Sequence, residues 1–351
     1  MAEVVMLSTN IKIARMAVGL SLQELSDRLK ENGYPTTKAT LSNYENGIYV
    51  PSNDILKEIS KELNTSMEFL LDNTITECDL RFFQKADMID RVQQSLEAFI
   101  TKELSRFIHI DNILGYKAEW TYTKKTLYRT DDTAAIENLA YRFRTEHGAG
   151  SHTIASVCDM LERKGWHIFA LPDYCRNNRT ISGYDCISGT PFILYKPDEY
   201  QDEMRLSLLR SVGYSLIEGE TREDTDALVA HFARAVLIPE NLVRYTFGNN
   251  RNTITETELA TAKKMYGIGK KYLMRRMWEL EIISDDLFSD YMTYISQRYD
   301  LVRSSGLTDD SRFYDVPTSY EMRVARAHAE GLTTITSAKS SYSDKDGNSE
   351  S

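Results

Sequence analysis

Residues 37–47 read Thr-Lys-Ala-Thr-Leu-Ser-Asn-Tyr-Glu-Asn-Gly, and this short stretch decides the fold of the N-terminal part of the chain. Leu41 and Tyr44 are three residues apart, which is the spacing that places two apolar side chains on one face of a helix. Gly47 ends the pattern, because glycine disfavours continuation of a helix. The stretch therefore predicts a short helix over residues 37–45, with Leu41 and Tyr44 facing a core.

Similar short helices are predicted on both sides of this stretch. The helix before it begins at Ser21, where Ser21 and Glu24 form a capping box, and it ends before Gly33. Leu22, Leu25 and Leu29 give that helix an apolar stripe. The other predicted helices cover about residues 10–16, 52–63 and 66–71. Residues 8–72 are thus expected to form a five-helix domain.

This arrangement resembles the Xre/Cro family of helix-turn-helix domains, whose recurring I-S-x-W/Y-E-x-G is close to T-L-S-N-Y-E-N-G at residues 40–47. The resemblance implies that the helix over 37–45 enters the major groove of double-stranded DNA. There an ammonium or amide group contacts phosphates or base edges, and a methyl group contacts thymine. The expected DNA-binding residues are Thr37, Lys38, Ala39, Thr40, Ser42 and Asn43, with Gln23 and Arg15 outside that helix.

Two departures from the family pattern concern the preceding helix. Leu22 stands where the family often has a glutamine that braces a phosphate, and Gln23 is one place off. The turn between the second and third helices is also several residues longer than usual. With a formal net charge of −10 for the chain, DNA binding needs a local basic patch, which we expect from Lys12, Arg15 and Lys38. The alternative is that these helices form only a protein-interaction module.

Residues 79–114 are predicted to form one or two long helices that link the N-terminal domain to the rest of the chain. Apolar residues recur there at steps of three and four, beginning at Leu80 and Phe83 and continuing to Ile108. Such a stripe either packs on its own chain or makes a linker helix that also dimerises. Regulators that read two DNA half-sites usually act as dimers, so a homodimer is expected.

Residues 133–300 are predicted to form a second domain of helices around a small sheet. Helical patterns precede a strand at 166–171, further strands are expected at 181–184 and 191–195, and helices follow at 203–218 and 224–237. From about 133 to 245 this order resembles the ImmA/IrrE family of metallopeptidase-like domains. The spacing that supports the resemblance is carried by Arg205, Gly213, Phe232, Ala233 and Pro239.

The residues that bind zinc and perform catalysis in that family are replaced in this chain. Active members carry two histidines four residues apart on a helix, with a glutamate between them that activates a zinc-bound water. Arg210 and Tyr214 stand at the two histidine positions, Ser211 at the glutamate and Leu228 at the downstream carboxylate. None of these side chains is a zinc ligand of the family's type. We therefore expect no peptidase activity, no metal and no cofactor.

The same face could instead hold an effector or a partner. The expected pocket residues are Arg210, Ser211, Tyr214, Leu228 and His231. Arg210 could bind an anion or a carboxylate with two hydrogen bonds, or it could pair with Asp224 or Asp226 and fill the space of the metal. His231 alone is more often a structural histidine than a ligand.

Three other features of the sequence limit which functions are expected. Lys263, Lys264, Lys270, Lys271, Arg275 and Arg276 could form a second nucleic-acid patch, although such charges usually form a solvated helix face. The four cysteines make no C-x-x-C pair, and no signal peptide or membrane span is evident, so a cytoplasmic protein is expected. Residues 331–351 have almost no apolar side chains and should be disordered.

Together these patterns predict a mostly α protein with a small β-sheet (α+β). The expected function is a dimeric repressor of a phage or mobile-element type operon. A small molecule or an antirepressor protein would control it through the degenerate peptidase-like domain. The alternative is an antitoxin-like protein that neutralises a partner and autoregulates its operon. An active metallopeptidase is a third class, against which the missing ligands argue.

Overall fold

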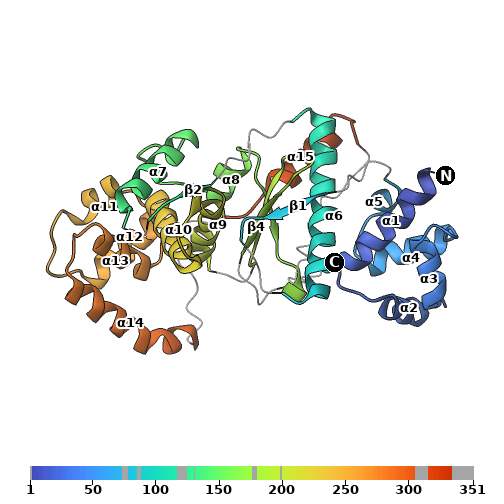
Figure 1. Cartoon of the computed structure of the whole chain (residues 1–351), viewed down its shortest axis with the longest axis horizontal. Coiled ribbons are helices and arrows are strands. Elements are labelled where there is room, and N and C mark those ends of the chain that lie inside the picture. The colour runs from blue at the N-terminus through green and yellow to red at the C-terminus, as the bar shows by residue number, and fades with distance from the viewer. Residues whose placement is uncertain are drawn as a thin grey trace, which may run out of the picture.

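The computed structural model describes residues 2–72, 78–84, 88–116, 125–129, 131–175, 180–197, 200–304 and 315–333. The fold is mostly α-helical with a small β-sheet, as predicted (Figure 1). The described residues form an N-terminal module of five short helices and a larger body, and helix α6 (Asp90–Leu114) stands between them.

The N-terminal module contains α1 (Ala2–Ala17), α2 (Leu22–Glu31), α3 (Lys38–Glu45), α4 (Asn53–Glu62) and α5 (Met67–Leu71). The predicted capping box at Ser21 and Glu24 is confirmed, and Thr37, Ser52 and Ser66 cap the next three helices. These caps satisfy backbone N–H groups that a helix start leaves without partners. The first helix is longer than predicted, because it begins at Ala2 instead of near residue 10.

The prediction of one or two long helices over residues 79–114 is wrong at its start. Residues Leu80–Phe82 form strand β1, and α6 begins only at Asp90. The strand forms because β4 (Ile181–Asp185) offers it a free edge, on which Leu80 pairs with Asp185 and Phe82 with Gly183. Gly183 permits this approach, since a Cβ there would lie 2.3 Å from the carbonyl oxygen of Arg81. The segment after the N-terminal module therefore belongs to the sheet of the body.

The main sheet has the strand order β1-β4-β5-β3, with β5 (Pro191–Tyr195) parallel to β3 (His167–Ala170) and antiparallel to β4. Successive side chains of a strand point to opposite faces. Accordingly Phe192 and Leu194 join the core under α6, while Ile193 and Tyr195 join the core under α9 (Gln201–Leu216). The sheet is thus a buried middle layer between helices.

The rest of the body is helical apart from a short second sheet. Strands β2 (Thr126–Leu127) and β6 (Ile217–Glu218) pair in parallel. The remaining elements are α7 (Thr133–Glu146), α8 (Val157–Glu162), the 3₁₀ turn η1 (Asp173–Cys175), α10 (Arg222–Leu237), α11 (Glu240–Phe247), α12 (Glu256–Tyr266), α13 (Lys270–Glu279), α14 (Asp285–Ser304) and α15 (Ser319–Ala329).

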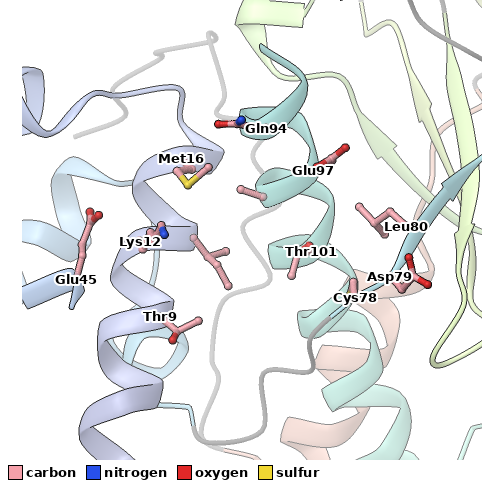
Figure 2. A pocket seen from close by; sticks show the side chains of 12 residues that line it. Thr9, Lys12, Met16, Glu45, Cys78, Asp79, Leu80, Gln94, Glu97 and Thr101 are labelled. Atoms are coloured by element: carbon pink, nitrogen blue, oxygen red, sulfur yellow. The ribbon is translucent and has the colours of Figure 1, made fainter. Parts of the chain in front are cut away.

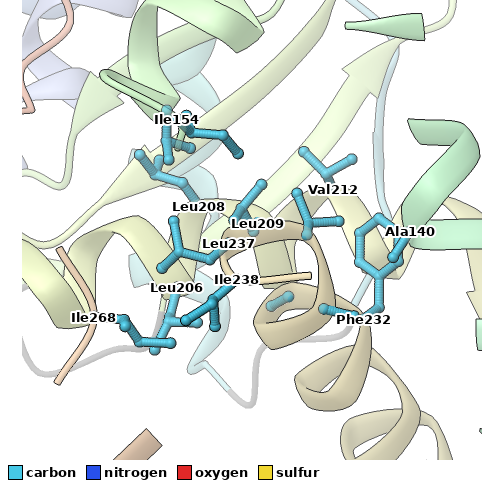
Figure 3. Packing of buried hydrophobic residues seen from close by; sticks show 14 of the residues in the cluster. Ala140, Ile154, Leu206, Leu208, Leu209, Val212, Phe232, Leu237, Ile238 and Ile268 are labelled. Carbon is cyan, nitrogen blue, oxygen red and sulfur yellow. The ribbon is translucent and has the colours of Figure 1, made fainter. Parts of the chain in front are cut away.

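The central packing of the body is between α9 and α10. A Cβ on Gly213 would lie 3.0 Å from Val229 and 3.2 Å from Phe232, so glycine lets the two helices approach this closely without displacing those side chains. Figure 3 shows Val212, Phe232 and Ala140 gathered where α9, α10 and α7 meet. Gly213, Phe232 and Ala233 are therefore part of the close packing between α9 and α10.

The apolar stripe of α6 packs on its own chain. Leu96, Phe99, Ile100 and Leu104 are buried against the sheet, and the opposite side of α6 contacts α1 of the N-terminal module. Of the two interpretations of this stripe, the geometry favours intramolecular packing, because the stripe is not exposed to a second copy.

Residues 315–333 return to the body as a C-terminal strap, which the sequence patterns did not predict. Asp315 is buried, accepts hydrogen bonds from the backbone N–H groups of Val157 and Cys158, and pairs with the buried guanidinium of Arg205. Helix α15 then packs along α6. The expected disordered tail over 331–351 lies outside the described residues from position 334 onward.

Candidate nucleic-acid interface

Helix α3 presents its N-terminal half to solvent. Thr37, Lys38 and Ala39 are exposed, and Thr40 is half-buried. One turn further along, Ser42 and Asn43 are half-buried, whereas Leu41 and Tyr44 face the core as predicted. The module contacts α6 through α1. Figure 1 shows α3 on the far side of the module from α6, so the body leaves this helix uncovered.

Local hydrogen bonds fix the shape of the exposed surface of α3. The Thr37 hydroxyl accepts a hydrogen bond from the backbone N–H of Thr40 at 3.1 Å and lies 2.9 Å from the Thr40 hydroxyl. Asn46 donates its side-chain amide to the Ser42 hydroxyl at 3.3 Å. The cap holds the first turn rigid, which leaves Lys38 at its exposed end as the cationic side chain of the helix.

Arg15 occupies a different position from the one expected. Its Nε and Nη2 donate to the two carboxylate oxygens of Glu45 at 2.5 and 2.9 Å, and its Nη1 donates to the Leu20 carbonyl at 2.6 Å. Its side chain is only 12% exposed. This guanidinium is therefore engaged within the module, and the geometry assigns it to bracing α1 against α3 instead of to contacting DNA.

Gln23 and Lys12 lie on different surfaces of the module. Gln23 is exposed on α2, where its amide donates to Asp27 at 2.9 Å. Lys12 lies on the face of α1 that looks toward α6, where it lines a cavity (Figure 2). Of the three basic residues expected to provide positive charge, Lys12 and Arg15 lie on α1, and Lys38 is the one on the uncovered helix α3.

Sequence reasoning missed an apolar loop directly after α3. Ile48, Tyr49 and Val50 are 56–61% exposed, and the backbone N–H groups of Ile48 and Tyr49 both donate to the Asn43 carbonyl. These bonds fix the loop to the end of α3. The signal was present as an apolar triplet between Gly47 and Pro51, where a turn is usually polar.

The residues of the expected effector pocket separate into two groups. Arg210 and Tyr214 lie close together on α9, and the Tyr214 hydroxyl donates to a carboxylate oxygen of Asp226. Burial and this carboxylate raise the pKa of Tyr214, while the nearby Arg210 opposes the rise. Asp226, one of the two carboxylates considered for Arg210, is thus bound by Tyr214.

The other three expected pocket residues point into the protein. Leu228 is 3% exposed within the main core, and the Ser211 hydroxyl, 1% exposed, donates to the Ser207 carbonyl. The His231 ring bonds to a Glu137 carboxylate oxygen at 2.6 Å and is 8% exposed. These three side chains are therefore buried structural positions, and an effector on this face would meet Arg210 and Tyr214.

This face does not fit the zinc ion of active peptidase-like domains. The Arg210 guanidinium is a cation without a lone pair to donate, and the Tyr214 hydroxyl is bound to Asp226. Throughout the described residues, no three histidine, cysteine, aspartate or glutamate side chains are placed to share a metal ion.

The basic cluster at 263–276 is paired with carboxylates. Lys270 contacts Glu256, and Lys271 contacts Glu203. Buried Arg276 binds Glu137 through both terminal nitrogens. Since these charges are matched within the chain and Arg276 is buried, the cluster offers little net positive charge to a nucleic acid.

Comparison with known proteins bears on the N-terminal module. Residues 11–70 match a family model described as Helix-turn-helix. Comparison with curated proteins found no match, and neither did comparison with solved structures. In the described part of the chain, no helix is both long and apolar enough to cross a membrane. Residues 11–70 therefore form a helix-turn-helix domain of the Xre type, and the chain is a DNA-binding transcription regulator.

Proposed function

We propose that the protein is a repressor that binds its operator as a dimer and is controlled through a peptidase-like domain without catalytic activity. The observation that carries the proposal is the uncovered position of α3, with the module held to the body through α1. The reading helix can therefore enter a major groove while the body stays attached.

In this proposal Lys38 contacts a phosphate or a guanine edge, and Asn43 pairs with adenine. Ala39 and Thr40 lie beside them and can touch a thymine methyl. Two half-sites about one helical turn apart would be read by two copies of the chain. The resemblance to Xre/Cro regulators supports this arrangement and also an operon of phage or mobile-element type.

The body would act as a receiver of a signal. Its resemblance to ImmA/IrrE domains is supported by the structural roles of Arg205, Gly213 and Phe232, which are all buried. The substituted positions Arg210 and Tyr214 would receive an antirepressor or a small anion. An effector changes operator affinity only if it binds the DNA-competent and DNA-incompetent arrangements with different affinity. Equimolar zinc in the purified protein would contradict the non-catalytic part of the proposal.

The first experiment identifies the operator by sequencing the DNA that the native protein retains, and then measures binding to that fragment by gel shift. Lys38→Ala and Asn43→Ala should each weaken specific binding about tenfold, which corresponds to about 1.4 kcal/mol within the range for a base-edge contact. If Lys38 contacts a phosphate, Lys38→Ala should also reduce the slope of log affinity against log salt concentration by about one.

Lys264→Ala is the matched control, because it removes the same charge from an exposed position on α12. It should leave operator affinity unchanged. Unaltered binding by both α3 variants would remove α3 as the reading helix. Failure to enrich any palindromic site would shift the assignment to the antitoxin-like interaction protein, and a search for a bound partner would follow.

A further inference from the structure

Three consecutive apolar side chains are exposed directly after the reading helix. Ile48, Tyr49 and Val50 are 60%, 61% and 56% exposed, on the connection between the end of α3 at Glu45 and the start of α4 at Asn53. A single exposed apolar residue needs no explanation, because much of any protein surface is apolar. Three in a row on a short connection form a patch, which we call the apolar triplet.

The backbone holds the apolar triplet in place at both ends. The N–H group of Ile48 donates to the Asn43 carbonyl at 2.9 Å, and the N–H group of Tyr49 donates to the same carbonyl at 3.5 Å. Beyond the triplet, Pro51 is buried and Ser52 caps α4. The triplet is therefore a fixed part of the surface beside α3, and its exposure follows from the fold of the module.

The chemistry of the apolar triplet does not suit the DNA backbone. Phosphates are contacted by cationic or polar side chains and by backbone N–H groups. The sequence from 46 to 53 contains no lysine, arginine or histidine, and the N–H groups of Ile48 and Tyr49 are already bonded to Asn43. The side chains of Ile48 and Val50 can form no hydrogen bond. The triplet is therefore better matched to a protein surface than to phosphate.

The charge around the apolar triplet favours a second copy of this chain as the partner. The chain has a formal net charge of −10, so two copies repel each other on average. The sequence from 46 to 53 also lacks aspartate and glutamate, and Glu45 before it is ion-paired with Arg15 and only 6% exposed. An apolar patch is complementary to itself, as a two-fold contact between identical chains requires. Two copies can therefore exclude water at this patch without bringing like charges together.

The size of the patch decides where this contact forms. Specific and stable interfaces bury at least about 1,200 Å² in total. Two apolar triplets supply less than this, because even a completely buried aromatic side chain contributes only about 200 Å² and each triplet has one. The contact is too small to hold two free copies together. It becomes effective when another molecule holds the two copies close to each other.

An operator with two half-sites would hold two copies in this way, and this step rests on the proposed function. Because the apolar triplet is continuous with the DNA-binding surface of α3, the operator brings the triplets of both copies to the same stretch of duplex. We propose that the apolar triplets of two copies pack against each other on one operator and make operator binding cooperative. The contact names the surface at which the two copies meet.

The first test measures gel shifts of the full chain on a fragment with two half-sites and on a fragment with one. The double variant Ile48→Ser with Tyr49→Ser should weaken binding to two half-sites at least about tenfold, because the apolar contact between copies is lost. Binding to one half-site should stay the same, since the backbone bonds to Asn43 do not need these side chains. Tyr245→Ser is the matched control, because it removes a tyrosine that is 85% exposed on α11, and it should alter neither affinity.

Two results of this test would overturn the proposal. An equal loss on both fragments would show that the apolar triplet contacts DNA. Unchanged binding of the double variant to both fragments would show that the triplet takes no part in operator binding. Thermal unfolding of the double variant, matched to that of wild type, confirms that any loss arises from the surface and not from the fold.

A second readout reports on the contact without an operator. Two copies of Tyr49→Cys that meet at the triplet can form a disulfide when an oxidant is added. At high protein concentration this variant should form crosslinked dimers several-fold faster than Tyr245→Cys, and operator DNA should accelerate it further. Both variants carry Cys186→Ser, because the native Cys186 thiol is exposed. Equal crosslinking rates of the two variants, with and without operator, would overturn the proposal.

The two readouts separate this inference from the proposed function. A chain that crosslinks through Tyr49→Cys but retains no specific DNA would keep the contact between copies and remove the repressor. A chain that binds two half-sites equally well with and without its apolar triplet, and that crosslinks no faster than the control, would keep the repressor and remove the contact.

Discussion

Arg15 connects two helices of the DNA-binding module through a paired contact that is largely hidden from solvent. The guanidinium binds both carboxylate oxygens of Glu45, whose side chain is only 6% exposed. Two parallel hydrogen bonds of this kind fix geometry as well as charge. The position of α3 on α1 therefore depends on a residue that a reading of sequence alone would place on the DNA.

Arg15→Ala should destabilise the protein by about 3 kcal/mol, because it leaves the carboxylate of Glu45 shielded from water without its partner. Urea unfolding measures the loss. A double variant, Arg15→Met with Glu45→Leu, should recover most of it, since removing both charges avoids an unpaired one. Arg129→Ala serves as the control, because its pair with Asp131 is exposed and should be worth less than about 1 kcal/mol. Equal losses in the two single variants would contradict the bracing role.

At the scale of elements, the strap formed by residues 315–333 is held at three points. Asp315 binds the start of α8 and Arg205, and Glu162 at the end of α8 accepts hydrogen bonds from Thr318 and Ser319 at the start of α15. Arg323 of α15 adds an ion pair with Asp111 of α6. The strap thus ties the C-terminal helix to both α8 and α6.

The strap should respond to pH through Glu162. Burial raises the pKa of this carboxyl to about 7, although the bonds from Ser319 and Thr318 act in the opposite direction. Between pH 4.5 and 7 the unfolded chain releases this proton while the folded chain keeps it, so stability falls as the pH rises. The full loss is roughly 3 kcal/mol for a shift of this size.

Glu162→Gln cannot titrate, so its free energy of unfolding should improve relative to wild type as the pH rises from 4.5 to 7. Urea unfolding at pH 5 and pH 7.5 measures this difference, in which other titrating groups cancel. Glu330→Gln, at a half-exposed position near the end of the same strap, should show no such change. A constant difference between wild type and Glu162→Gln would show that the carboxyl is already ionised at pH 5.

Elements set by nearby residues were predictable, and those set by distant partners were not. The capping box at Ser21 and the cap at Thr37 depend on residues three positions away, so their helices were found from the sequence. Strand β1 depends on β4, about a hundred residues later, and its Leu80 was taken for a helical position. Asp315 gave no signal, because its partners at Val157 and Arg205 come together only in the fold.

In the candidate sites, too, features set by nearby residues were predictable and features set by distant contacts were not. The exposed residues of α3 were predictable, because the spacing of Leu41 and Tyr44 fixes which face turns outward. The engagement of Arg15 by Glu45 and the cavity between α1 and α6 were not, because each depends on a contact between separate helices. A basic residue on a helix predicts a charge, and the tertiary contacts decide whether that charge is free to meet DNA.

At the scale of the whole molecule, the module and the body have separate cores joined along α1 and α6. The ion pair between Arg91 and Glu24 across this boundary is long, at 3.4 Å, and both side chains are exposed. Exposed ion pairs of this kind contribute little. Tyr174 makes a closer contact, since its ring packs over Gly19 and its hydroxyl lies 3.0 Å from the carbonyl oxygens of Ala17 and Ser95.

Tyr174→Phe should therefore loosen the attachment of the module without unfolding it. It removes one hydroxyl shared by carbonyls of α1 and α6, a loss of about 1 kcal/mol, which corresponds to roughly fivefold faster hydrogen exchange where the boundary opens. Exchange measured by mass spectrometry should rise at the C-terminal end of α1 and stay constant in α4, whose Ile59 belongs to the module's own core. Tyr245→Phe, at a position that is 85% exposed, should change neither. A uniform rise across the module would mean that the boundary and the module core unfold together, and α1 could then not move as a unit relative to α6.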